Sequence, residues 1–166
     1  AKHRVHAACL QELSAPIATL GSQYEEIRGL KLKSHLTGPD PELQHCTAGV
    51  GVLYAGFKIL KLIPNTQALK DIQNGGRFQL LGVVLPNRMM LIIANVYGWT
   101  GGAQDQHASS RTDHLLELVF LEFQSRPRGP KMVVGDLNGD PHHFPTLDAA
   151  LKAEGFIDVG DHPCTN

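Results

Sequence analysis

The sequence is poor in aromatic residues and almost free of net charge, and each shortage excludes a class of protein. Aromatics make up 6% of the 166 residues, and 15 Lys plus Arg against 16 Asp plus Glu give a net charge of -1. A chain without a basic excess has no global field for polyanions, so any such binding must come from a local feature. The 42% hydrophobic content argues against disorder and indicates one globular domain over residues 1–166.

Cysteine is scarce and long apolar runs are missing. Cys9, Cys46 and Cys164 are far apart and form no C-x-x-C spacing for zinc or redox chemistry, so we expect free thiols in a reducing compartment. The longest apolar stretches, Leu80–Leu85 and Met89–Ala94, fall far short of the roughly 20 residues of a membrane span. The first residues show no signal-peptide pattern. A soluble intracellular protein, in the cytoplasm or nucleus, is expected, and the absence of an initial Met suggests a longer parent sequence.

Apolar runs and alternation predict strands that alternate with helices. The predicted strands are Val5–Leu10, Val50–Tyr54, Phe57–Ile63, Phe78–Leu85, Leu91–Tyr97 and Met132–Val134. Three helices are predicted: one capped by Ser14, one beginning near Ser110 with Asp113 in a capping box, and one from Thr146 to Gly155. The strands Phe78–Leu85 and Leu91–Tyr97 are joined by the turn Pro86-Asn87-Arg88, which is the strongest indication of a β-hairpin in the sequence. The fold class is therefore mixed α/β with layered sheets.

Polar residues follow three of the predicted strands at the point where each strand ends. These residues are Gln11 with Glu12, Asn95 with Tyr97, and Asp136 with Asn138. Strand ends are where mixed α/β folds place binding and catalytic groups. The three pairs are therefore candidates for one functional site.

In this order, the segments Gln-Glu, Asn-Val-Tyr and Gly-Asp-Leu-Asn resemble the endonuclease/exonuclease/phosphatase family, which includes deoxyribonuclease I. The resemblance runs along nearly the whole chain, and Gly-Asp-Leu-Asn is its most specific element. It implies a sandwich of two packed mixed β-sheets flanked by helices. It also implies a Mg²⁺-dependent phosphoesterase, with Mn²⁺ as the alternative ion, acting on nucleic acid or another phosphoester. No protein partner is indicated.

The resemblance also implies a role for each residue. Glu12 would be the metal ligand, and Asp136 would orient or deprotonate the attacking water. Asn138 would fix that water or bind phosphate, Tyr97 would contact the scissile phosphate, and Asn95 would support the loop of Asp136 and Asn138. Hydrolysis of a phosphodiester needs these functions, because charge on the phosphate oxygens must be neutralised and water must be aimed in line with the leaving oxygen.

Each assignment has a simpler alternative. Glu12 could be a solvated residue, Asp136-Leu137-Asn138-Gly139 a plain turn, and Tyr97 an ordinary strand aromatic. The common pattern favours the functional interpretation. The histidines, including His142, His143 and His162, lack zinc-ligand spacing and are interpreted as loop residues. Arg77 and Arg111 are interpreted as solvated surface residues.

The pattern departs from the family at both ends. Family members end in a Ser-Asp-His element, whereas Asp161-His162-Pro163 follows Gly-Asp-Leu-Asn too closely to be that element. Nothing before Val5 supplies the family's early Asn-bearing strand. We therefore expect a domain incomplete at both ends, with negligible activity by itself. Three other interpretations stay open: a catalytically dead remnant or interaction domain, a phosphatase of a small substrate, and a zinc protein.

Overall fold

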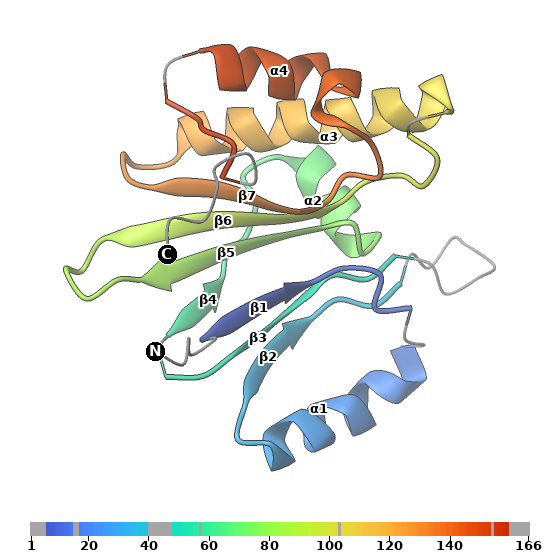
Figure 1. The fold of residues 1–166 in the computed structure, drawn as a ribbon. Helices are drawn as coiled ribbons and strands as arrows, with labels where there is room; N and C mark the ends of the chain where they lie inside the picture. Colours follow the sequence, from blue (N-terminus) through green and yellow to red (C-terminus); the bar gives the residue numbers. More distant parts are fainter. Residues whose placement is uncertain are drawn as a thin grey trace.

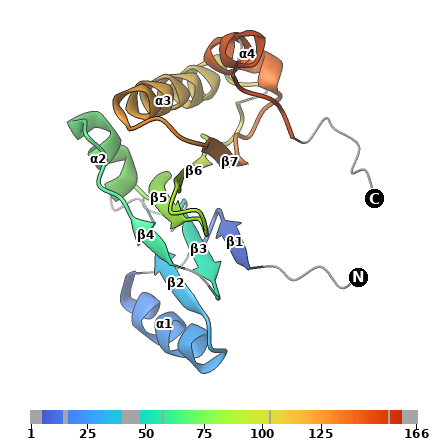
Figure 2. The same cartoon turned by 90° about the vertical axis from the view of Figure 1, so that its left-hand side faces the viewer.

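Two β-sheets pack face to face, with helices on both outer sides (Figures 1 and 2). The computed structural model describes residues 6–14, 17–39, 48–56, 58–102, 104–153 and 155–159. In Figure 2 the layers follow one another as helices, sheet, sheet and helix. The predicted fold class, a layered α/β sandwich of two packed sheets flanked by helices, is confirmed in this part of the chain.

The first sheet has three antiparallel strands in the order β1-β3-β2. Its strands are β1 (Ala7–Leu10), β2 (Lys33–Leu36) and β3 (Gly51–Tyr54). A short 3₁₀ turn, η1 (Ile17–Thr19), leads into helix α1 (Leu20–Gly29), which lies outside this sheet in both views. β3 is the central strand and is the most buried of the three. β1 and β2 are therefore the edges of this sheet.

The second sheet has four strands in the order β4-β5-β6-β7 and is mixed. Its strands are β4 (Ile59–Lys61), β5 (Phe78–Val84), β6 (Met90–Tyr97) and β7 (Lys131–Asp136). The first three are antiparallel, whereas β7 runs parallel to β6 after the crossover helix α3 (Gln106–Ser125). Helices α2 (Gln67–Asn74) and α4 (Pro145–Lys152), with the 3₁₀ turn η2 (Pro141–His143), lie on the same side as α3 (Figure 2).

Strand β5 connects the two layers of the core. Phe78 and Leu80 belong to the cluster beneath α3, with Leu115 and Val119 of that helix. The alternate residues Leu81 and Val83 instead pack with Val52, Tyr54 and Ile59 between the two sheets. Both faces of the strand are buried, which explains why its sequence is a continuous apolar run rather than an alternation.

The predicted hairpin is present as β5 and β6, and the other predicted strands are present with shifted ends. β4 is shorter than the predicted Phe57–Ile63. β1 begins at Ala7, and the predicted first residue, Val5, lies outside the described part. Strand β2 and helix α2 were not predicted. The residues of β2, Lys-Ser-His-Leu, carry no apolar alternation because this edge strand is only half-buried.

The predicted helix starts were wrong in each case. Helix α1 begins at Leu20 rather than after a Ser14 cap. Helix α3 begins at Gln106, where the side chain of Asp105 accepts a hydrogen bond from the His107 backbone amide. The Ser110 capping box is therefore absent, because that residue lies inside the helix. None of the helices in the described ranges is long and apolar enough to cross a membrane.

Asp113 has a different role, at the start of helix α4. Its carboxylate accepts hydrogen bonds from the backbone amide of Thr146 at 2.9 Å and from the Thr146 hydroxyl at 3.0 Å. Thr146 lies inside α4, which begins at Pro145, so its predicted role as the cap was wrong. A carboxylate from α3 instead satisfies the first free amide of α4 and fastens the two helices together.

Candidate functional site

Asn95 joins the two sheets at the end where the candidate residues lie. Its side chain is fully buried and its amide nitrogen donates to the carbonyl oxygens of Leu10, at 3.2 Å, and Gly51, at 3.0 Å. Its oxygen accepts a hydrogen bond from the side-chain nitrogen of Gln11 at 2.6 Å. Asn95 belongs to β6, whereas its three partners belong to or follow β1 and β3. The bonds therefore fix the end of β1 against β6.

Glu12 follows Gln11 directly and is solvent-exposed. Its φ of 53° is a left-handed backbone conformation, which turns the chain sharply away from β1. Just beyond it, the amides of Leu13 and Ser14 donate to the carbonyl oxygens of Gly49 and Ala48. The carboxylate is thus carried on a turn that is anchored on both sides.

Tyr97 and Asp136 lie side by side at the ends of β6 and β7, where they are partners in the parallel register. Tyr97 is only 3% exposed and packs with Ala48 and Val50, whereas Asp136 is exposed. β1, β6 and β7 run in the same direction, so their carboxyl ends lie at the same side of the molecule (Figure 1).

The loop after β7 is closed by its own polar side chains. The Asp136 carboxylate accepts a hydrogen bond from the backbone amide of Asn138 at 2.8 Å. Asn138, with φ of 56°, donates its side-chain amide to the carbonyl oxygen of Gly98 at 3.1 Å. Asp136 keeps its second carboxylate oxygen for another partner.

Glycines allow the close approach of β6 to this loop. A Cβ on Gly135 would lie 1.9 Å from the carbonyl oxygen of Val96, and one on Gly98 would lie 2.3 Å from that of Leu137. Both contacts are impossible for any other residue without a backbone shift. The glycine of Gly-Asp-Leu-Asn is thus a packing requirement.

The structure corrects the expected role of Asn95. Its hydrogen bonds go to the first sheet and not to the loop of Asp136 and Asn138, whose support comes from within the loop and from Gly98. The Asn95 amide is fully buried between the sheets and must be hydrogen-bonded there, and its partners come from the facing sheet. Asn95 and Tyr97 on β6, Asp136 on β7 and Asn138 in the loop after β7 still lie, with Glu12, at one end of the sandwich.

Sequence reasoning misjudged Arg77, which is 6% exposed rather than solvated. Its guanidinium lies 5.3 Å from the centre of the Tyr97 ring and 4.8 Å from that of Trp99. It also donates to the carbonyl oxygen of Gly98 at 2.9 Å. Arg111 is exposed as expected and lies 4.4 Å from the same Trp99 ring. An Arg just before a buried strand was the only signal for Arg77 in the sequence.

The metal-binding donors at this end are carboxylates, the ligand type that Mg²⁺ prefers. No group of three or more His, Cys, Asp or Glu able to hold a metal ion is found in the ranges that the structure describes. Zinc sites need three or four protein ligands, whereas Mg²⁺ keeps several waters and takes one or two carboxylates. Glu12 and Asp136 are exposed carboxylates of this kind. His162 and Asp161 lie outside the described residues.

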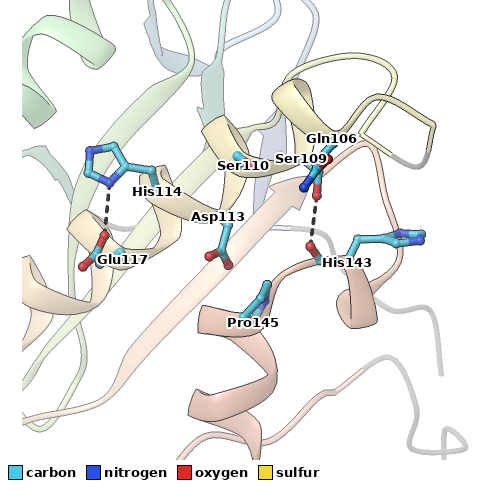
Figure 3. Close-up of a pocket in the computed structure, with 8 residues that line it drawn as sticks. All are labelled: Gln106, Ser109, Ser110, Asp113, His114, Glu117, His143 and Pro145. Atoms are coloured by element: carbon cyan, nitrogen blue, oxygen red, sulfur yellow. Dashed lines mark hydrogen bonds and ion pairs between the residues drawn. The ribbon is translucent and has the colours of Figure 1, made fainter.

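Two pockets are lined by residues other than the five candidates. One, of about 310 Å³, is formed by α3 and the segment from His143 to Pro145 and contains the ion pair of His114 with Glu117 (Figure 3). The other, of about 670 Å³, lies between β7 and residues 155–159 and is mainly apolar. The second pocket is nevertheless lined by Val96, Gly135 and Leu137, the chain neighbours of Tyr97, Asp136 and Asn138.

Of the three cysteines, only Cys9 lies in the described part of the chain, where it is a free thiol. It is half-buried and packs against the cluster between the sheets. Burial raises the pKa of its thiol, because the charged thiolate loses hydration. Cys9 is therefore a packing residue of β1 and not an activated nucleophile.

Comparison with solved structures identifies the fold. The sequence matches no protein-family model and no curated protein sequence. An AP endonuclease from Archaeoglobus fulgidus superposes with a TM-score of 0.54 at 12% identity, over 89% of this chain and 58% of that chain. Beta toxin from Staphylococcus aureus superposes with a TM-score of 0.51 at 10% identity, over 89% of this chain and 57% of that one.

This chain thus spans under three fifths of the length of each of these two proteins, and at these identities the likeness concerns the fold alone. The layers, the mixed second sheet and the crossover through α3 agree with the fold that the sequence resemblance implied. The chain therefore has the layered fold of these two structures and aligns with a part of each.

Proposed function

We propose that this chain carries the metal-binding and water-orienting part of a Mg²⁺-dependent phosphoesterase site, in a protein that hydrolyses phosphodiester bonds of nucleic acid. The observation that supports it most is the hydrogen bond of 2.6 Å between Gln11 and Asn95. It brings the turn of Glu12 to the strand pair that holds Tyr97 and Asp136 side by side. Residues far apart in sequence thereby reach one end of the molecule.

In the proposed site, Glu12 would hold the ion, and Asp136 would serve the attacking water. When bound, Mg²⁺ neutralises charge on the phosphate oxygens. Asp136 accepts a hydrogen bond from the attacking water through the oxygen that Asn138 does not occupy, and can take its proton. The Tyr97 side chain is only 3% exposed, so its hydroxyl would contact a non-bridging phosphate oxygen from beneath this surface. The loop geometry is set in advance by the bond of Asn138 to Gly98.

Calorimetric titration with Mg²⁺, repeated with Mn²⁺, tests this proposal. Wild type should bind one ion, and Glu12→Gln should abolish binding or weaken it by at least tenfold. Glu26→Gln, at an exposed position of α1, is the matched control and should bind as wild type does. Binding that is unaffected by Glu12→Gln would refute the assignment, and no binding at all would favour an interaction domain of the same fold.

Hydrolysis is tested separately on plasmid DNA with Mg²⁺. Because the chain spans under three fifths of the AP endonuclease, we expect its own turnover to be negligible. Turnover that is lost in Glu12→Ala and kept in Glu26→Ala would contradict this expectation of inactivity while supporting the assignment of Glu12.

A further inference from the structure

Two arginines lie against one indole ring beside the candidate site. The guanidinium carbons of Arg77 and Arg111 lie 4.8 Å and 4.4 Å from the centre of the Trp99 ring, within the range of cation–π contacts. The arrangement therefore concentrates positive charge on a protein whose net charge is close to zero.

Only Arg111 of this pair is free to meet a ligand. Arg77 is 6% exposed and donates to the carbonyl oxygen of Gly98. Arg111 is exposed and makes no ion pair with any of the residues described in the structure. Its donors are left for an external anion, and a guanidinium binds phosphate with fixed geometry.

The indole is itself positioned by the fold. The backbone amide of Trp99 donates to the Thr112 hydroxyl at 3.0 Å, which ties the segment after β6 to α3 at the residue next to Arg111. Trp99 also packs against the core cluster beneath α3. Stacking on a held ring restricts the arginine before any ligand arrives, so less conformational entropy is lost on binding.

We propose that Arg111, oriented by Trp99, binds a phosphate of a single-stranded polynucleotide other than the phosphate that is cleaved. Trp99 is two residues beyond Tyr97, and Arg77 contacts both rings. The Trp99 ring and the Arg77 guanidinium thus lie between Arg111 and Tyr97, the residue assigned to the scissile phosphate. A ligand that reaches both positions must carry more than one phosphate, as a nucleic-acid strand does. This inference rests on the proposed function, which places the scissile phosphate at Tyr97.

Fluorescence anisotropy with a labelled decathymidylate tests the proposal on the full chain. EDTA is present throughout, so that the result does not depend on metal binding. Arg111→Ala should weaken binding on the order of tenfold, and the slope of log affinity against log salt should fall by about 0.7, which is one phosphate contact on a single strand. Arg111→Lys should keep the salt slope and bind more weakly than wild type, because the planar stack is lost.

Arg88→Ala is the matched control. Arg88 is exposed in the turn between β5 and β6, at the opposite end of β6 from Tyr97, and its loss removes the same charge. Affinity and slope should match wild type. Equal losses in Arg88→Ala and Arg111→Ala, or no measurable binding by wild type, would overturn the proposal.

Competition with thymidine monophosphate separates a polynucleotide from a small phosphoester. If Arg111 contacts a second phosphate, the mononucleotide should compete equally well in wild type and in Arg111→Ala. Competition that is weakened in the variant to the same extent as decathymidylate binding would overturn the polynucleotide assignment. A positive result here with no Mg²⁺ binding would leave the Arg111 contact standing while the metal proposal fails.

Discussion

Replacing Asn95 by Ala should destabilise the whole sandwich, although the residue lies at the candidate site. The side chain is fully buried and makes three hydrogen bonds, with the Gln11 side chain and with the carbonyl oxygens of Leu10 and Gly51. At about 0.5 to 1.5 kcal/mol net for each bond, the free energy of unfolding should fall by about 2 to 4 kcal/mol. That is a large part of the roughly 5 to 15 kcal/mol of a typical domain.

Urea denaturation followed by circular dichroism measures this loss. With a slope of about 2 kcal/mol per molar urea, the midpoint should move down by about 1 to 2 M. Gln11→Ala removes one of the three bonds and should cost about 1 kcal/mol. Asn95→Asp should cost at least as much as Asn95→Ala, because an oxygen would face the two carbonyl oxygens that now receive hydrogen bonds.

Asn74→Ala is the control for that series. Asn74 is exposed at the end of α2, and its substitution should change stability by no more than about 0.5 kcal/mol. A loss below about 1 kcal/mol for Asn95→Ala, similar to that of Asn74→Ala, would refute the view that Asn95 fastens the sheets together. Its role would then be confined to the site.

Further substitutions and measurements test other parts of the fold. Glu122→Ala removes a buried carboxylate that pairs with an arginine and accepts a backbone amide of the segment before α2, so urea denaturation should show a loss of about 2 to 4 kcal/mol. Gly135→Ala, whose Cβ would meet the Val96 carbonyl oxygen at 1.9 Å, should cost about 2 to 4 kcal/mol, whereas Gly21→Ala, with open space around the new Cβ, should raise the thermal midpoint. With the other two cysteines replaced by serine, Cys9 should react with iodoacetamide more slowly than free cysteine at neutral pH, because burial raises its pKa. The same shift means that the neutral thiol favours the folded state at pH values below the pKa of an exposed thiol, and that this contribution is lost as the pH rises through the folded pKa.

The sequence was sufficient to predict those elements whose residues carry a local signal. The hairpin of β5 and β6 was predicted because two apolar runs flank a turn of Pro, Asn and Arg. Strand β2 could not be predicted, since its half-buried edge position imposes no apolar pattern on Lys33–Leu36. The start of α3 was misplaced because Asp113 satisfies the amides of another helix, a tertiary choice that local spacing does not reveal.

Some features of the candidate site could likewise be predicted from the sequence, and others depend on tertiary contacts. Its residues were chosen because polar pairs follow strand ends, and the register that pairs Tyr97 with Asp136 agrees with that choice. The partners of Asn95 could not be predicted, because they depend on how one sheet faces the other. Arg77 was missed for a related reason: an arginine is expected in solvent, and only the fold supplies the two aromatic rings that accompany its burial.

The bond between Gln11 and Asn95 also has a consequence for how the protein folds. It joins positions 84 residues apart, and contacts of such sequence separation form slowly because a long loop must close first. An intermediate with its hairpin and helices formed would therefore lack the geometry around Glu12. Under the proposed function, uptake of Mg²⁺ during refolding would report the docking of the two sheets, as a kinetic step later than the recovery of helical signal.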